Sequence, residues 1–244
     1  MDESEILKRI KEYSWYTPID FGNGIIATGN FKVSTALENI HFGMGKWQYI
    51  IERNLPDLQG KRVMDLGCNN GIFCIEMARR GATDVIGVDS EKTWPNWKSQ
   101  AEFVKEALEW RCRTKYPIRF VDSDMDRISY FNFGRFDVVT ALCSIYYLEE
   151  DRMYSLLKHL RETSDLVLIQ GNTRREDQTP EVHRRALPEY IGRMLEKVGF
   201  PFITYDCPLF YERPVVVGSN APVRQRTSGI LKVDRFRDWM RRKI

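Results

Sequence analysis

The sequence predicts an α/β fold: a seven-stranded, mostly parallel Rossmann-like sheet with helices on both faces and an antiparallel last strand. Three observations support this prediction. Short apolar runs alternate with helical patterns along most of the 244 residues, the first run leads into a glycine-bearing turn at 67–71, and the second ends on an acid, Asp89. A chain of this length can bury one sizeable core and carry a small appendage.

The expected strands are the apolar runs themselves. In chain order they span 61–66, 84–89, 118–121, 136–141, 166–170, 202–205 and 215–218. The last two are expected to pair as an antiparallel hairpin, because the loop between them contains Pro208.

Helices are expected between the strands, where apolar residues recur at helical spacing. One helix follows the glycine turn at 72–80. Two later helices each show a single apolar face, formed by Trp97, Ala101, Val104 and Leu108 in one and by Leu156, Leu157 and Leu160 in the other.

The chain is expected to divide into three segments. Residues 1–45 form an N-terminal helix and a lid segment, 46–218 form the core, and 219–244 form a basic, helical tail. The aromatic, glycine-rich stretch 15–24 is interpreted as a lid over the site. For residues 1–13, a helix docked passively on the sheet is the alternative.

The tail holds most of the charge asymmetry. Residues 224–244 contain eight basic side chains against Asp234 and Asp238, a net charge of +6, which leaves −3 for the rest of a chain whose net charge is +3. A basic amphipathic helix of this kind binds RNA phosphates, an acidic membrane surface or the protein's own acidic body. All three remain open.

Composition points to a globular protein of the cytoplasm. Hydrophobic residues make up 43% of the chain and charged residues 29%, no apolar stretch approaches the roughly 20 residues that span a bilayer, and the N-terminus is acidic. We therefore expect no stable membrane insertion. The five cysteines are widely spaced with no C-x-x-C pair, so reduced thiols and no metal site are expected.

The glycine turn and the acid together predict a site for a ribose-containing ligand. Gly67 and Gly71 allow the backbone to bend sharply and a ligand to approach it closely. The following helix presents free N–H groups, and Asp89 stands where an acid accepts hydrogen bonds from ribose hydroxyls.

The turn itself argues against a dinucleotide. Asn69 occupies the second glycine position of a Gly-x-Gly-x-x-Gly motif, and Asp65 places a negative charge just before the turn. A carboxylate there repels phosphate and suits a ligand with an ammonium and a sulfonium. We therefore favour S-adenosylmethionine as the cofactor.

These residues carry a family resemblance. The run Asp65-x-Gly67-x-Asn69-x-Gly71, the acid Asp89 and the strand 136–139 resemble motifs of the class I S-adenosylmethionine-dependent methyltransferases over roughly residues 45–218. Asn69 departs from the usual glycine, but asparagine tolerates a left-handed backbone. The segments 15–24, 46–47 and 144–147 are similar to the branch that contains the tRNA wobble-uridine carboxymethyltransferases.

The expected cofactor residues come from successive strand ends and from the segment before the first strand. By resemblance Asp124 and Met125 meet the adenine, although local capping is an alternative for Asp124, and Trp47 either contacts the sulfonium or packs in the core. The full set is Trp47, Asp65, Gly67, Cys68, Asn69, Gly71, Asp89, Ser90, Asp124, Met125 and Leu142.

The expected acceptor site is less closely defined. His183 follows the polar loop after the fifth strand and Tyr146 follows the fourth, so both are candidate catalytic groups. Trp15, Tyr16 and Tyr147 are candidate substrate contacts. In the carboxymethyl branch a cation must also meet the extra carboxylate of the donor, a role that Lys46 could take.

These observations predict an enzyme that moves a methyl group to a hydroxyl or amine of a small molecule, such as a sugar or secondary metabolite. One alternative is a tRNA wobble-uridine modifying (carboxy)methyltransferase. Another is a regulator that binds S-adenosylmethionine and catalyses nothing.

Overall fold

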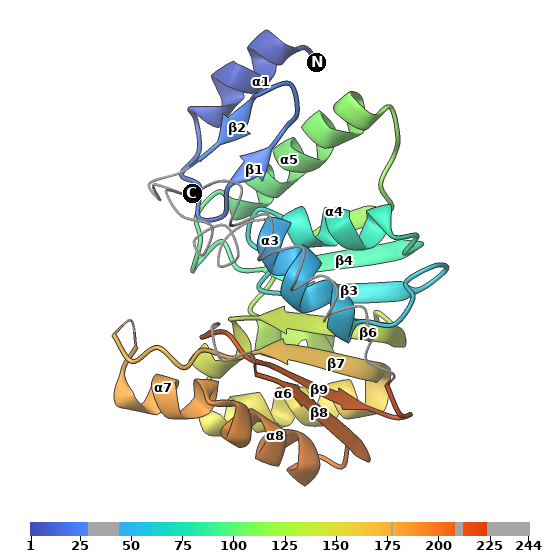
Figure 1. Ribbon diagram of the computed structural model, residues 1–244, viewed down its shortest axis with the longest axis vertical. Coiled ribbons are helices and arrows are strands. Elements are labelled where there is room, and N and C mark those ends of the chain that lie inside the picture. Colours follow the sequence, from blue (N-terminus) through green and yellow to red (C-terminus); the bar gives the residue numbers. More distant parts are fainter. Residues whose placement is uncertain (29–43, 177, 208–211, 224–244) are drawn as a thin grey trace, which may run out of the picture.

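The computed structural model describes residues 1–28, 44–176, 178–207 and 212–223. Its centre is a seven-stranded sheet (Figure 1). In spatial order the strands are β5 (Ile118–Asp122), β4 (Asp84–Asp89), β3 (Arg62–Leu66), β6 (Phe136–Leu142), β7 (Ser164–Gln170), β9 (Val215–Ser219) and β8 (Phe202–Asp206).

The pairing confirms the predicted fold class. Strands β3 to β7 are parallel to one another, whereas β9 is antiparallel to both β7 and β8. The hairpin predicted for the last two strands is therefore present. Strand bounds differ from the sequence prediction by at most two residues.

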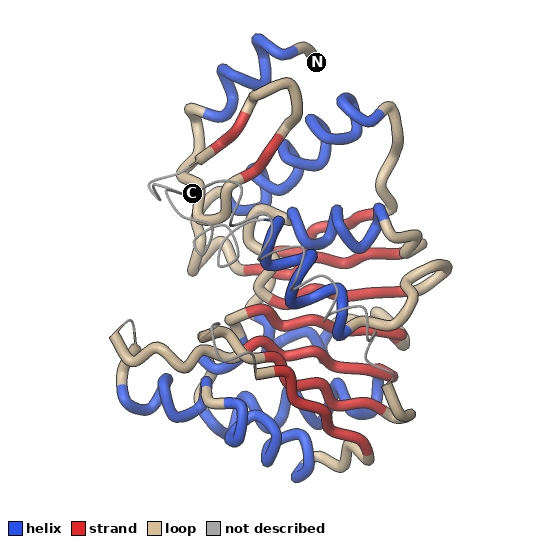
Figure 2. Tube along the Cα trace, viewed as in Figure 1, coloured by secondary structure: helices blue, strands red, loops and turns tan. Residues whose placement is uncertain are grey.

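Helices cover both faces of the sheet because its strands are apolar on both sides. One face packs against α4 (Ile72–Arg79), α5 (Trp97–Cys112) and the consecutive short helices α3 (Met44–Lys46), η1 (Trp47–Ile51) and η2 (Glu52–Asn54). The other packs against α6 (Glu150–Thr163), α8 (Pro188–Lys197) and η3 (Met125–Tyr130). Figure 2 shows the strands of the sheet with helices packed around them.

Two further short helices follow strands of the sheet: η4 (Ile145–Tyr147) comes after β6, and α7 (Pro180–Ala186) comes after β7. The sequence prediction left both unassigned, because each is too short to show a helical period.

The N-terminal segment packs beside α5 (Figure 1). It contains α1 (Glu3–Ile10) and a two-stranded antiparallel sheet of β1 (Ile19–Asp20) and β2 (Ile26–Ala27). Glu3 accepts from Arg111 Nη1 at 2.7 Å, and Arg9 pairs with Glu106 at 3.1 Å. The remainder of the predicted lid segment, 29–43, and the basic tail from 224 onward lie outside the described residues. Within the described part, no helix is both long and apolar enough to cross a bilayer.

Candidate active site

The turn between β3 and α4 needs its glycines. Gly67, Asn69 and Gly71 all have positive φ, at 78°, 45° and 75°, which confirms that Asn69 adopts the left-handed backbone expected of it. A Cβ at Gly67 would lie 2.6 Å from the Cβ of Ser144, so no larger residue fits there without displacing a neighbour.

Asp89, at the end of β4, is held against this turn by two hydrogen bonds from backbone N–H groups. Its Oδ2 accepts from the backbone N of Asn69 at 2.7 Å and its Oδ1 accepts from the N of Ser90 at 2.8 Å. Burial raises the pKa of Asp89, and the two N–H donors oppose that change. Each oxygen keeps acceptor capacity for a ribose hydroxyl.

Asp124 is hydrogen-bonded to the hydroxyl of Ser90, the residue that follows Asp89 at the carboxyl edge of the sheet. Ser90 Oγ donates to Asp124 Oδ1 at 2.9 Å. Although Asp124 is the residue before η3, its side chain makes no capping bond to that helix. Its carboxylate is thus oriented toward Ser90, at the carboxyl edge of the sheet.

A cavity of about 580 Å³ opens beyond the carboxyl ends of β3, β4, β5 and β6, where ligands collect in folds of this kind. Ten of the residues named from the sequence line it: Tyr16, Lys46, Gly67, Asn69, Asp89, Ser90, Asp124, Met125, Leu142 and Tyr147.

Three aromatic residues named from the sequence lie outside the cavity lining, because they serve as packing. Trp15 packs edge-on against Phe21, with ring centroids 6.0 Å apart. Trp47 is fully buried and stacks with Phe73 at 6.1 Å. Tyr146 is also fully buried, and burial raises its pKa far above the usual range, so its phenol stays protonated.

Four other residues named from the sequence also lie outside the cavity lining, three of them at or beneath the glycine turn and one in α7. Asp65 and Cys68 are buried beneath the turn, and Gly71 forms the N-terminal cap of α4. His183 lies in α7, and its Nδ1 has no hydrogen-bond partner among the described residues.

The cavity also contains residues that the sequence did not single out: Lys92, Trp94, Asp126, Arg152 and Arg213. Trp94 stands 5.6 Å from Tyr16, centroid to centroid, so an aromatic pair borders the cavity. No periodicity or spacing marks these residues, since Asp126 lies in η3, Arg152 in α6 and the others in loops after β4 and before β9.

Two basic residues, Lys46 and Arg213, also line the cavity. Lys46 is only 8% exposed; burial lowers its pKa, and Arg213 lowers it further. Within the described part of the chain, neither side chain has a carboxylate within ion-pair distance. Their positive charge therefore suits an anionic group of a bound ligand.

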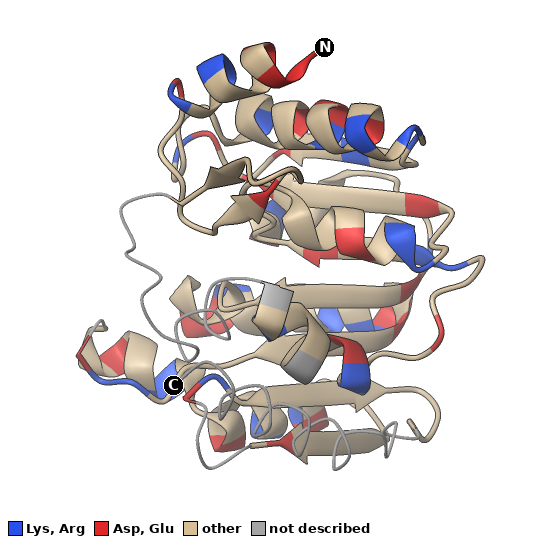
Figure 3. Ribbon diagram, turned by 45° about the horizontal axis from the view of Figure 1, so that its top comes forward, with Lys and Arg blue, Asp and Glu red and all other residues tan. Residues whose placement is uncertain are grey.

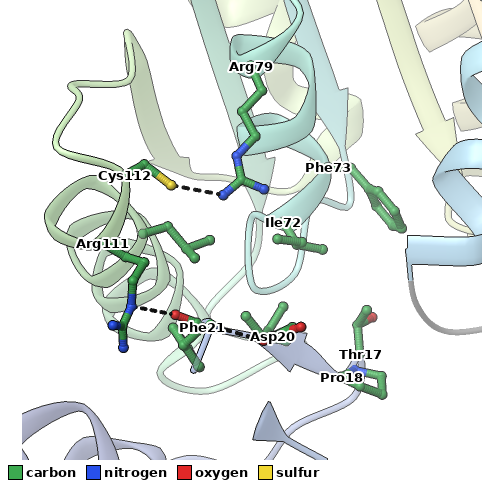
Figure 4. Close-up of a pocket in the computed structure, with 12 residues that line it drawn as sticks. Thr17, Pro18, Asp20, Phe21, Ile72, Phe73, Arg79, Arg111 and Cys112 are labelled. Atoms are coloured by element: carbon green, nitrogen blue, oxygen red, sulfur yellow. Dashed lines mark hydrogen bonds between the residues drawn. The ribbon is translucent and has the colours of Figure 1, made fainter. Parts of the chain in front are cut away.

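A second hollow, of about 280 Å³, lies between the N-terminal segment and helices α4 and α5. Its arginines already have partners: Arg79 points toward Cys112 and donates to its Sγ at 3.6 Å, and Arg111 Nε donates to the carbonyl of Phe21 at 2.9 Å (Figure 4). The larger cavity is therefore the candidate active site.

Comparison with known proteins decides what kind of site this is. Residues 40–205, more than half of the chain, match the model of a family described as a methyltransferase domain. The chain belongs to this family. Its strand order and glycine turn make it a class I S-adenosylmethionine-dependent methyltransferase.

Two curated relatives illustrate the range of the family. The chain is 29% identical over 169 residues to a magnesium-protoporphyrin O-methyltransferase of Rhodobacter capsulatus, covering 69% of this chain and 70% of that protein. It is 29% identical over 198 residues to a tRNA U34 carboxymethyltransferase of Alcanivorax borkumensis, covering 80% of this chain and 56% of that protein. The chain thus spans just over half the length of this second relative.

Among solved structures, the N-terminal domain of EvdMO1 with SAH bound has a TM-score of 0.62 at 19% identity, covering 90% of this chain and 97% of that one. This likeness shows a shared fold. The cofactor of the family, S-adenosylmethionine, fits the residues present: Gly67 and Asn69 of the turn line the cavity, Asp89 has acceptor capacity for ribose hydroxyls, and Asp65 has a buried oxygen, Oδ2, without a partner among the described residues.

Proposed function

We propose that this methyltransferase acts on a hydroxyl or amine of a small molecule, such as a sugar or secondary metabolite. One observation carries the proposal: a single cavity extends from Asp89 and Asp124 to Tyr16 and Tyr147. Donor and acceptor would thus share one chamber. Its volume of about 580 Å³ lies within the range of small-molecule sites, roughly 300–1,000 Å³.

In this proposal the chain mainly positions the two reactants. Asp89 holds the ribose, Asp124 meets the adenine, and Met125 and Leu142 form apolar walls that exclude water. When bound, S-adenosylmethionine supplies an electrophilic methyl group. The acceptor's lone pair would form the new bond to the methyl carbon as the carbon–sulfur bond breaks with its electron pair on sulfur, and the acceptor would lose its proton to water.

Neither of the two candidate catalytic residues is placed to act as a general base in this structure. Tyr146 keeps its proton, so its phenol can donate a hydrogen bond but does not serve as a base at neutral pH. His183 lies outside the cavity lining and would have to move in order to reach an acceptor. Approach and alignment of the reactants are therefore the proposed source of catalysis.

A labelling experiment tests the acceptor class. A cell extract is separated into RNA and small-molecule pools, and each is incubated with methyl-labelled S-adenosylmethionine and the protein. Label should enter the small-molecule pool and should be lost with Asp89→Ala, which removes the ribose acceptor. Label found in the RNA pool alone would contradict the proposal.

A second candidate is modification of a tRNA wobble uridine with a carboxylated donor. Lys46 and Arg213 favour it, because two cations facing one cavity without a carboxylate partner among the described residues would suit an additional carboxylate. The described surface offers less support, since acidic and basic residues are mixed along helices such as α5 (Figure 3). Mass spectrometry of the cofactor that co-purifies with the protein distinguishes the two donors by one carboxylate.

A further inference from the structure

We infer that Thr140 is a positioning residue of the donor site, whose hydroxyl keeps the carboxylate of Asp65 charged and oriented for a cationic donor. The inference rests on the proposed role of Asp65 as the negative charge that favours the ammonium and sulfonium of S-adenosylmethionine. Thr140 itself touches neither reactant.

The two residues are held together by the sheet. Asp65 on β3 and Thr140 on β6 are register partners in adjacent parallel strands, and both are buried, at 1% and 0% exposure. Thr140 Oγ1 lies 2.7 Å from Asp65 Oδ1 and 3.4 Å from the carbonyl of Met64. A hydroxyl has one proton, and the shorter, charge-assisted bond to the carboxylate takes it.

Asp65 has few other means of staying ionised. Burial raises its pKa to about 6, the Thr140 hydroxyl and Lys46 oppose that change, and Asp89 adds to it. The thiols of Cys68 and Cys74 also face it beneath the turn. No other described group donates a hydrogen bond to this carboxylate.

Replacing the hydroxyl by a methyl group should therefore change the charge of Asp65 near neutral pH. Thr140→Val keeps the shape of the side chain but leaves Oδ1 unpaired, so the carboxyl group becomes protonated at a higher pH. Thr140→Ser keeps the donor and should behave as wild type. Thr140→Ala removes the hydroxyl without adding bulk and covers the case in which the valine variant fails to fold.

The test is calorimetric titration between pH 5 and 7.5, below the titration of the donor's own ammonium. Wild type should bind S-adenosylmethionine with an affinity that falls as the pH drops through about 6. In Thr140→Val the midpoint should rise by about one pH unit. 5′-Methylthioadenosine, which has neither the ammonium nor the sulfonium, should show no difference between the two proteins.

The controls separate the possible failures. Thr163→Val removes a hydroxyl whose bond, to the carbonyl of His159, lies within α6, and it should leave the profile unchanged. Equal pH profiles for wild type, Thr140→Val and Thr140→Ala would overturn the role of Thr140. A change shared by both ligands would mean that the site is merely distorted. No binding of S-adenosylmethionine to wild type would instead count against the donor site itself.

Discussion

Asp65 is a carboxylate in a place that water barely reaches. Folding takes it from a pKa of 3.8 to about 6, which corresponds to a cost of up to about 3 kcal/mol, at roughly 1.4 kcal/mol for each tenfold change in proton affinity. Between these two pH values the folded state holds more of the proton than the unfolded state. Stability therefore falls as the pH rises through this window, and the cost is complete above it. A bound cation would offset part of that cost.

Asp65→Asn should weaken the binding of S-adenosylmethionine and at the same time stabilise the free protein. The amide removes the buried charge, so thermal unfolding at pH 7.5 should occur several degrees higher than in wild type. The gain should shrink as the pH falls toward 4 and disappear near pH 3, below both pKa values, where Asp65 is protonated in both states. A variant that is less stable at pH 7.5 yet binds the donor normally would show that this charge does not serve binding.

At the scale of single elements, the glycine turn combines a left-handed backbone with a position in the cavity lining. Gly67→Ala and Gly60→Ala make a matched pair, because both glycines have φ above 70° but only Gly67 has neighbours within 4 Å of an added Cβ. Each substitution should cost about 1 kcal/mol of stability for its positive φ. Only Gly67→Ala should also lose donor binding in calorimetry. Equal losses in both variants would mean that backbone strain, and not contact at the turn, limits binding.

Elements of this kind are also what the sequence predicts best. The strands β3 to β7 are recognisable because buried parallel strands are continuous apolar runs, and the turn is recognisable from its glycines. Contacts between distant elements leave no such local trace. Arg213 and Trp94 reach the cavity only through tertiary structure, and sequence alone does not tell that Trp47 faces the core while Tyr16 faces the cavity.

At the scale of the whole molecule, the N-terminal segment is joined to the cofactor turn. Asn70, which is 1% exposed, donates from Nδ2 to the carbonyl of Thr17 at 3.1 Å. Its neighbour Asn69 is bonded to Asp89, and the neighbour of Thr17 is Tyr16, which lines the cavity. A continuous series of contacts thus connects Asp89, the residue proposed to bind the ribose, with Tyr16, which lines the same cavity.

Asn70→Ala should loosen this connection. The carbonyl of Thr17 would lose a buried partner, a change worth about 1–3 kcal/mol, and amide hydrogen exchange in residues 14–21 should speed up. Asn23→Gly is the control: it removes a surface hydrogen bond to Glu3, and glycine tolerates the positive φ of 52° at this position, so the change should matter little. If the two variants exchange alike, the N-terminal segment is held by its other contacts.

The reversed direction of β9 has a consequence for how this scaffold diversifies. Because β9 is antiparallel to its neighbours, Arg213, two residues before the strand, stands at the same edge as the residues that follow β3, β4 and β6. Another parallel strand would have delivered that arginine to the opposite edge. We therefore expect substitutions at Arg213, ahead of β9, to change which acceptor the enzyme uses while the residues around Asp89 stay in place.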